Sequence, residues 1–223
     1  MQFRFNIHHF ERAVRDDSGG YRVYTTPKGQ VYPSITTVLS KTKTESDKKH
    51  LQDWIDNTPH SEYISSEARD IGTQTHQLIE DYLHNRPSSI KVDLLSIAHF
   101  ERIKVFLHKI TEVHGTEEML YSDKLKLAGT ADCIGMYDGN LSIIDYKTKR
   151  SDQRESYLTD YFLQSTAYSI MWEEMTGDPI HQIVILVSSR KGQLKEFIVN
   201  PDDYKDELLC RVKSYYEMDN CKS

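Results

Sequence analysis

Three charged residues near the middle of the chain have the types and spacing needed for hydrolytic chemistry. Asp145 and Lys147 follow the apolar segment LSII (141–144), and Asp132 precedes Asp145 by thirteen residues. Buried strands rarely contain charge unless it is paired or coordinated. Two adjacent carboxylates repel each other, and Mg²⁺ or Mn²⁺ removes that penalty. With a lysine ammonium to orient or deprotonate water, or to stabilise phosphate charge, these residues predict a site that hydrolyses a phosphodiester.

The elements around these residues are predicted to bring them together. Side chains alternate along a strand, so Asp145 and Lys147 share a face while Tyr146 points away. The segment YDGN (137–140) contains Asp-Gly, a strong hairpin signal, and an antiparallel hairpin there brings Asp132 beside Asp145. The backbone carbonyl oxygen of Tyr146 is predicted to be a further metal ligand. Taken alone, the D-x-K pattern is common and is more typical of an ordinary surface ion pair.

The remaining pattern predicts an α/β fold. Residues 1–33 are predicted to form strands and turns, and a helix follows that is capped near Ser34. Residues 44–114 have helical periodicity with a break at Pro87, and residues 117–148 change to the period of strands. A helix over 155–175, two strands and an amphipathic helix starting near Pro201 complete the chain. We therefore expect a mixed central sheet flanked by helices.

Composition narrows the functional classes. The chain has 223 residues, a formal net charge of −6 and a pI near 5.9, which disfavours nonspecific coating of nucleic acid. Two local basic strips lie at 41–50 and 147–154. No apolar run is long enough to cross a bilayer, and the N-terminus lacks signal-peptide features, so we expect an intracellular protein without membrane partners.

The cysteines do not indicate a metal cluster. Cys133, Cys210 and Cys221 are widely spaced and form no CxxC pair. Neither a four-cysteine iron–sulfur cluster nor a structural zinc site can be assembled from them within one chain. Free thiols are the simplest interpretation, and no iron–sulfur cofactor is expected.

Four short motifs together resemble the RecB-like exonuclease branch of the PD-(D/E)XK nucleases. They are GTQTH (72–76), AGTAD (128–132), IIDYKT (143–148) and QSTAY (164–168). The segment YPSITTVL (32–39) is also similar to phage exonucleases and to the mitochondrial genome maintenance exonuclease. The resemblance implies a restriction-endonuclease-like core in a single nuclease domain over 1–223. Its N-terminal hairpin and helical part would occupy 1–115, and its catalytic α/β core 116–223.

The resemblance also implies roles for individual residues. The expected metal ligands are His76, Asp132, Asp145 and the Tyr146 carbonyl, and the expected catalytic residues are Asp132, Asp145 and Lys147. Gln164 and Tyr168 match a QxxxY motif whose spacing puts both on one helical face. The supporting acidic residues are Glu118, before the first core strand, and Glu80, on the His76 face of its helix. The alternative is structural: a packed helix histidine, and a polar and an aromatic residue at a helix–sheet boundary.

The basic strip after the catalytic strand predicts a path for DNA. Lys147, Lys149, Arg150 and Arg154 lie on or just after that strand. Gln164 and Tyr168 would flank the path, with the tyrosine ring contacting a base or sugar. Solvated loop charges are the alternative interpretation of Lys149 and Arg150.

These observations predict a deoxyribonuclease that uses Mg²⁺ or Mn²⁺ and degrades DNA from single-stranded ends. The alternatives are a structure-specific endonuclease on the same core and a catalytically inactive DNA-binding subunit. DNA is the expected partner, together with proteins of replication or recombination. The expected compartment is the cytoplasm of a bacterium, or of the host if the chain is phage-encoded.

Overall fold

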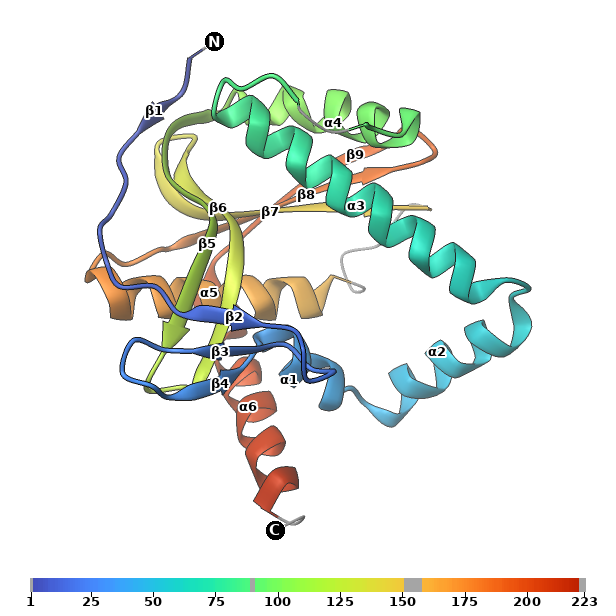
Figure 1. Cartoon of the computed structure of the whole chain (residues 1–223), viewed down its shortest axis with the longest axis vertical. Coiled ribbons are helices and arrows are strands. Elements are labelled where there is room, and N and C mark those ends of the chain that lie inside the picture. The colour runs from blue at the N-terminus through green and yellow to red at the C-terminus, as the bar shows by residue number, and fades with distance from the viewer. Residues whose placement is uncertain (1, 89–90, 151–157, 221–223) are drawn as a thin grey trace.

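The computed structural model describes residues 2–88, 91–150 and 158–220 (Figure 1). Its strands are β1 (Arg4–Phe5), β2 (Val14–Asp16), β3 (Val23–Thr25), β4 (Val31–Pro33), β5 (Ile110–Ser122), β6 (Leu127–Tyr137), β7 (Asn140–Lys149), β8 (Gln182–Ser189) and β9 (Leu194–Val199). Its helices are α1 (Ile35–Lys41), α2 (Glu45–Asn57), α3 (Ser61–Leu83), α4 (Leu94–Leu107), α5 (Thr159–Thr176), the 3-10 helix η2 (Pro201–Tyr204) and α6 (Lys205–Asn220). Among the described helices, none combines the length and apolar character needed to cross a membrane.

A mixed sheet of six strands forms the centre of the fold, in the order β1-β5-β6-β7-β8-β9. Strands β1 and β5 run parallel, as do β7 and β8, and the other neighbours are antiparallel. Asp138 and Gly139 join β6 to β7 with φ of 47° and 82°, as a two-residue hairpin turn requires. The mixed sheet predicted from the sequence is confirmed.

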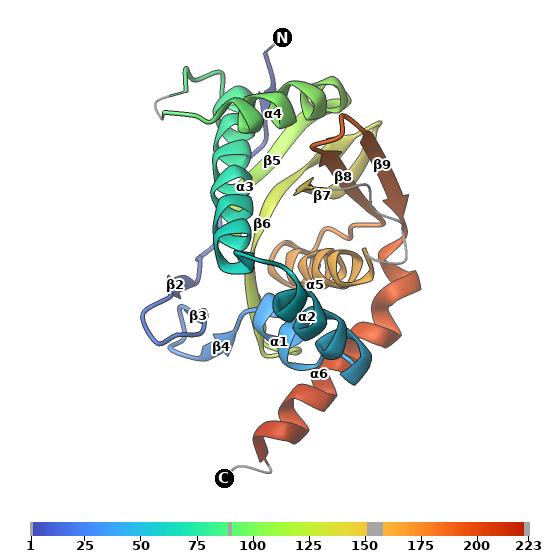
Figure 2. The same ribbon diagram turned by 90° about the vertical axis from the view of Figure 1, so that its right-hand side faces the viewer.

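Helices cover both faces of this sheet (Figure 2). On one face, α3 and α4 pack over an apolar core that includes Ile79, Ile103 and Val184. On the other face, α5 connects β7 to β8 and packs with α1 and α6 around Trp172. Burial of these two apolar layers provides the main drive for folding. The central strands are therefore shielded from water on both faces of the sheet, except beside the polar residues that the next subsection describes.

A second sheet of three strands, β2-β3-β4, packs beside β6. Tyr24 on β3 is fully buried, and its hydroxyl lies 3.0 Å from Oγ1 of Thr130 on β6. Ser34 pairs with Ala128 in an isolated parallel bridge. This sheet, named the small sheet below, confirms the predicted N-terminal hairpin and brings it against the strand that contains Asp132.

Some element boundaries differ from the sequence-based expectation. The helical region ends at Leu107, and β5 begins at Ile110. The sequence pattern looks helical beyond Leu107 because bulges in β5 space the buried residues Ile110 and Val113 three positions apart, as in a helix. Pro201 begins η2, and α6 begins at Lys205, after the Asn200 side chain has capped the 3-10 turn. The predicted helix over 155–175 begins at Thr159, and its residues 155–157 lie outside the described residues.

Candidate active site

The hairpin of β6 and β7 opens at the position of Asp132. Its last ladder pair is Cys133 with Ile144, so Asp132 and Asp145 are the next opposed residues. There the Tyr146 N–H donates its hydrogen bond to Oδ2 of the Asp132 side chain, at 3.1 Å, in place of a backbone carbonyl of β6. The predicted approach of the two aspartates is therefore present, with one carboxylate fixed to the neighbouring strand.

Asp145 and Lys147 form a tight ion pair beside this opening. The Lys147 ammonium lies 2.7 Å from Oδ1 and 2.6 Å from Oδ2 of Asp145, which is only 1% exposed. Burial raises the pKa of Asp145 to about 6, against the opposing effect of Lys147. Burial alone would lower the pKa of Lys147, but the carboxylates of Asp145 and Asp132 outweigh it and raise this pKa. The lysine is therefore a cationic hydrogen-bond donor at neutral pH.

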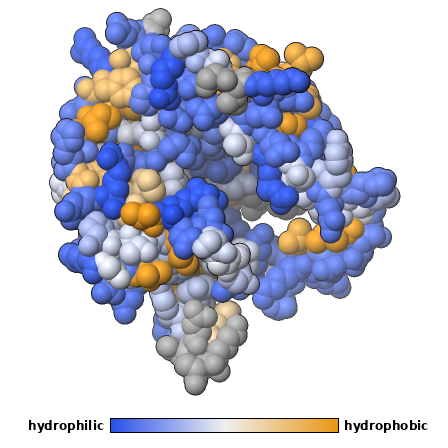
Figure 3. Space-filling view, viewed as in Figure 1, coloured by the Kyte–Doolittle hydropathy of each residue, from blue (hydrophilic) through white to orange (hydrophobic). Residues whose placement is uncertain are grey.

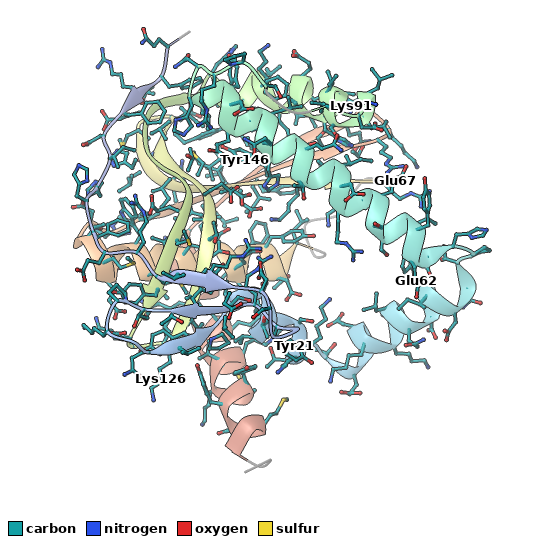
Figure 4. The ribbon with its side chains drawn as sticks, in the orientation of Figure 1. Tyr21, Glu62, Glu67, Lys91, Lys126 and Tyr146 are labelled. Carbon is teal, nitrogen blue, oxygen red and sulfur yellow. The ribbon has the colours of Figure 1, made fainter. Side chains whose placement is uncertain are left out.

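His76 reaches the same place from the middle of α3. Its Nε2–H donates to the Tyr146 carbonyl oxygen at 2.8 Å, which leaves the Nδ1 lone pair free to bind a cation. Nδ1 lies 3.5 Å from Oδ2 of Asp132 and 4.0 Å from Oε1 of Glu117. The Tyr146 carbonyl, expected to be a metal ligand, is thus the acceptor that orients His76. Figure 4 shows Tyr146 beneath α3, where its side chain joins the apolar core.

Glu117 is a member of the site that the sequence reasoning missed. It lies between the ladder pairs Thr116–Cys133 and Glu118–Ala131, which puts it opposite Asp132. Its φ of 47° is unusual for a residue other than glycine and indicates a functional constraint. Partial desolvation in the pocket, with the nearby Asp132 carboxylate, raises the pKa of Glu117 to about 7, although 46% of its side chain is exposed.

Within the described residues, one group of side chains has metal-ligand spacing: His76, Glu117 and Asp132, named the ligand cluster below. One ligand atom from each lies within 4.8 Å of the others. Asp145, whose oxygens contact Lys147, is the next carboxylate on the neighbouring strand. A hard cation would relieve the repulsion that raises the pKa of Glu117, so the donor set fits a divalent metal ion.

Glu118 lies apart from the ligand cluster, in contrast to the expected supporting role. Consecutive residues of a strand point to opposite faces, and Glu118 forms an ion pair with Arg12, at 2.5 Å from Nε and 3.1 Å from Nη2. Glu118 is buried, and this contact attaches the N-terminal segment to β5. The sequence contains two adjacent glutamates, and only the register with β6 decides which of them faces Asp132.

The two glutamates provide a matched test. We expect Glu117→Gln to weaken Mn²⁺ binding by about tenfold or more, as for the loss of a metal-site carboxylate. For the wild type, binding should weaken as the pH falls through about 7, because protons then compete for Glu117. Glu118→Gln should leave metal affinity unchanged and lower stability, because it breaks the Arg12 pair. Calorimetric Mn²⁺ titration and thermal unfolding of both variants check this; equal Mn²⁺ affinities would contradict it.

Gln164 and Tyr168 are adjacent on α5 and contact each other. The Gln164 amide donates to the Tyr168 hydroxyl at 2.9 Å, and both residues line the pocket that contains the ligand cluster. Tyr168 is only 2% exposed, and burial raises the pKa of its hydroxyl. The expectation that its ring contacts a base or sugar is therefore wrong: packing against β6 leaves no accessible ring face. Its hydroxyl instead positions Gln164.

Gly129 on β6 leaves the space that the Tyr168 ring occupies. A Cβ at this position would lie 2.6 Å from Cε1 of Tyr168 and 3.3 Å from a methyl of Ile35. We expect Gly129→Ala to cost about 1–3 kcal/mol of stability and to lower activity, because the Gln164–Tyr168 pair must move. Gly72→Ala is the control, since its Cβ would meet Thr148 at an ordinary 3.6 Å. Urea unfolding and kcat measure both effects; equal losses in the two variants would contradict the prediction.

The basic strip is partly engaged with α5. Lys149 donates to the Tyr161 hydroxyl, and its ammonium lies 4.6 Å from the centre of that ring. Arg150 is exposed, and Arg154 lies outside the described residues. Glu80 lines the same pocket as His76, but pairs with Arg86 at 2.9 Å. Lys149 and Arg150 remain predictions as DNA-binding residues, with Lys149 held by an aromatic partner.

The pocket around the ligand cluster has walls from several elements. Helix α3, strands β5 and β6, helix α5 and the small sheet all contribute lining residues. Figure 3 shows the molecule hollowed between the arm formed by α2 and the N-terminal part of α3 and the rest of the fold. The small sheet contributes Arg15 and Arg22, which sequence reasoning did not single out.

Comparison with known families decides how this geometry is classified. Residues 30–218 match the family model described as the PD-(D/E)XK nuclease superfamily. The chain belongs to this superfamily. This membership agrees with the resemblance that the motifs carried, and nucleases of this superfamily generally use divalent metal ions.

Relatives of this member of the PD-(D/E)XK superfamily include mitochondrial genome maintenance exonuclease 1 from Homo sapiens, 27% identical over 150 residues, and from Mus musculus, 27% identical over 147 residues. The matched regions cover 62% and 61% of this chain but only 43% of each relative, so the chain matches less than half of their length. A predicted exonuclease from Eubacterium rectale has a similar crystal structure, with a TM-score of 0.50 at 12% identity over 70% of this chain and 68% of that one. The last likeness concerns the fold.

Proposed function

We propose that this nuclease is a divalent-metal-dependent exonuclease that hydrolyses phosphodiester bonds from the ends of single-stranded DNA. The observation that carries the proposal is the ligand cluster beside the Asp145–Lys147 ion pair, at the base of an open pocket. The relatives named as exonucleases support the direction of the reaction from a strand end.

The side chains have distinct roles in this proposal. Nδ1 of His76 and the carboxylates of Glu117, Asp132 and Asp145 would hold Mg²⁺ or Mn²⁺. The bound ion would supply Lewis acidity for an attacking water and for the phosphodiester oxygen. Lys147 donates hydrogen bonds to that water or to the developing charge on phosphate.

Two groups keep these side chains in position. The Tyr146 carbonyl oxygen fixes the His76 ring, and the Tyr146 N–H fixes the Asp132 carboxylate. One peptide unit of β7 on each side of Tyr146 thus orients both metal ligands. Such fixed orientation reduces the reorganisation that catalysis requires.

The shape of the molecule favours single-stranded DNA over a duplex. The arm formed by α2 and the N-terminal part of α3 stands away from the body beside the pocket, and a flexible single strand fits such a confined approach better than a duplex (Figure 3). The negative formal charge of −6 leaves strand binding to local cations near the pocket. These features support an exonuclease that acts on single strands.

The decisive experiment compares linear and circular single-stranded DNA of the same sequence. We expect Mn²⁺ or Mg²⁺ to support digestion of the linear substrate only, and EDTA to stop it. Labels on either end of the linear strand report the polarity. Cleavage of the circle would establish an endonuclease, and the absence of cleavage with either metal would favour a DNA-binding subunit.

A further inference from the structure

The small sheet turns two arginines toward the candidate active site. Arg15 on β2 lies opposite Tyr24 on β3, and Arg22 precedes Tyr24 by two residues. Residues directly opposed in a sheet, and residues two apart on a strand, share one face. That face meets β6, where the Tyr24 hydroxyl contacts Thr130. Both arginines line the pocket of the ligand cluster.

The backbone of this sheet is fixed to β6 at the same point. The Arg22 carbonyl oxygen accepts a hydrogen bond from the Ser34 N–H at 3.1 Å, and Ser34 pairs with Ala128 of β6. Asp132 lies four residues further along β6. The arginines are therefore presented by a docked sheet whose position relative to the metal ligands is set by β6.

Asp17 lies between the two guanidinium groups. Its Oδ2 accepts hydrogen bonds from Nε and Nη2 of Arg15 at 2.8 and 2.5 Å, and its Oδ1 accepts one from Nε of Arg22 at 3.0 Å. An oxyanion held by two arginines is the geometry in which guanidinium groups also bind phosphate. The side chain of Asp17 is 51% exposed, so another anion can reach the same donors.

The same pocket also contains acidic side chains. Glu80 and Glu117 line it together with Asp132. A strand of nucleic acid that brings a phosphodiester to these carboxylates meets repulsion, unless cations bind its neighbouring phosphates. Arg15 and Arg22 are the cations that the small sheet places in the same pocket.

We propose that Arg15 and Arg22 form a phosphate subsite for the nucleic-acid strand in the active-site pocket, and that Asp17 occupies this subsite in the free protein. The inference rests on the proposed function, because it names how that site holds its substrate. Exposed ion pairs contribute little stability, so a phosphodiester can displace Asp17 at small cost.

The first test removes the competing carboxylate. Asp17→Asn should tighten binding of a labelled single-stranded oligonucleotide several-fold in fluorescence anisotropy, with EDTA present to prevent cleavage. Asp16→Asn is the matched control: it makes the same change in net charge one residue away, and the Asp16 carboxylate accepts from the Ser18 N–H. An equal gain in both variants would reduce the effect to net charge and overturn the role of Asp17.

The second test removes the arginines. Arg15→Gln with Arg22→Gln should weaken binding and flatten the dependence of log Kd on log salt by about 0.7 for each phosphate that is no longer neutralised. In cleavage assays, the double variant should raise KM more than it lowers kcat. Lys213→Gln on α6, whose side chain is 77% exposed, controls for the removal of a surface cation. A double variant with the salt dependence and KM of the wild type would overturn the subsite.

The two proposals fail in different ways. If wild type digests linear single strands and the arginine variants bind DNA like wild type, the phosphate subsite is wrong and the exonuclease stands. If DNA binding depends on Arg15 and Arg22 but no DNA is cleaved with Mn²⁺, the subsite stands and the exonuclease is wrong.

Discussion

Replacing Lys147 with methionine is expected to lower kcat by about a thousandfold, because its ammonium is the cationic donor beside the candidate metal ligands. The same change should destabilise the fold. Removal of one partner of a buried ion pair costs about 3–5 kcal/mol, and Asp145 is 1% exposed.

The pH dependence of this loss follows from the unpaired carboxyl. Without the ammonium, the folded-state pKa of Asp145 rises further above its unfolded value, so folding favours the protonated form. Relative to wild type, whose Asp145 has a folded-state pKa of about 6, the stability deficit of Lys147→Met should then grow as the pH rises above about 6. Thermal unfolding across this pH range measures it.

A double variant separates the loss of chemistry from the loss of folding. Asp145→Asn combined with Lys147→Met removes both charges and keeps similar volumes, so its stability should recover towards that of the wild type. Its activity should remain absent. Cleavage by Lys147→Met at the wild-type rate, at matched Mn²⁺ and folded fraction, would eliminate the proposed role of the lysine.

Asp132→Asn is expected to have opposite effects on activity and on metal-free stability. Cleavage should fall by at least about a hundredfold, because one ligand of the cluster loses its charge. Without metal, the melting temperature should rise, because the neighbouring Glu117 no longer faces a second carboxylate. Asparagine can still accept the hydrogen bond from the Tyr146 N–H, so the contact between β6 and β7 should remain intact.

Adding metal should make the wild type more stable than Asp132→Asn, the reverse of the order without metal. Mn²⁺ at a hundred times its Kd stabilises a one-site protein by about 2.7 kcal/mol, so wild type should gain and Asp132→Asn should not. Differential scanning fluorimetry with and without Mn²⁺ gives both comparisons, and Asp53→Asn on the exposed face of α2 controls for charge. A metal-free melting temperature at or below that of wild type, with an undiminished Mn²⁺ response, would contradict the prediction.

Much of the core could be predicted because local signals agree with the fold. Asp138-Gly139 specifies the turn between β6 and β7, and that turn determines that Asp132 and Asp145 are opposed. The order of the motifs implied that His76 would meet Asp132, and their side chains lie 3.5 Å apart. These relations depend on short sequence distances or on recognisable motifs.

The remaining site residues depend on tertiary features that a single sequence does not specify. The choice of Glu117 over Glu118 depends on two bulges in β5 and on a positive φ. The burial of Tyr168 depends on its packing against Gly129 of another element. Arg15 reaches the pocket only because the small sheet docks on β6, a contact between segments about 100 residues apart.

The docked small sheet also bears on where the functional unit of this nuclease starts. The superfamily match begins at residue 30, yet residues before it make structural contacts with the core. Tyr24 buries its ring against β6, and Arg12 pairs with Glu118. A fragment trimmed to the family boundary would uncover apolar surface around Ala128 and remove one wall of the pocket. The minimal functional unit of this chain is therefore larger than its family signature, and we propose that the additional length acts as a covalently attached accessory for substrate binding.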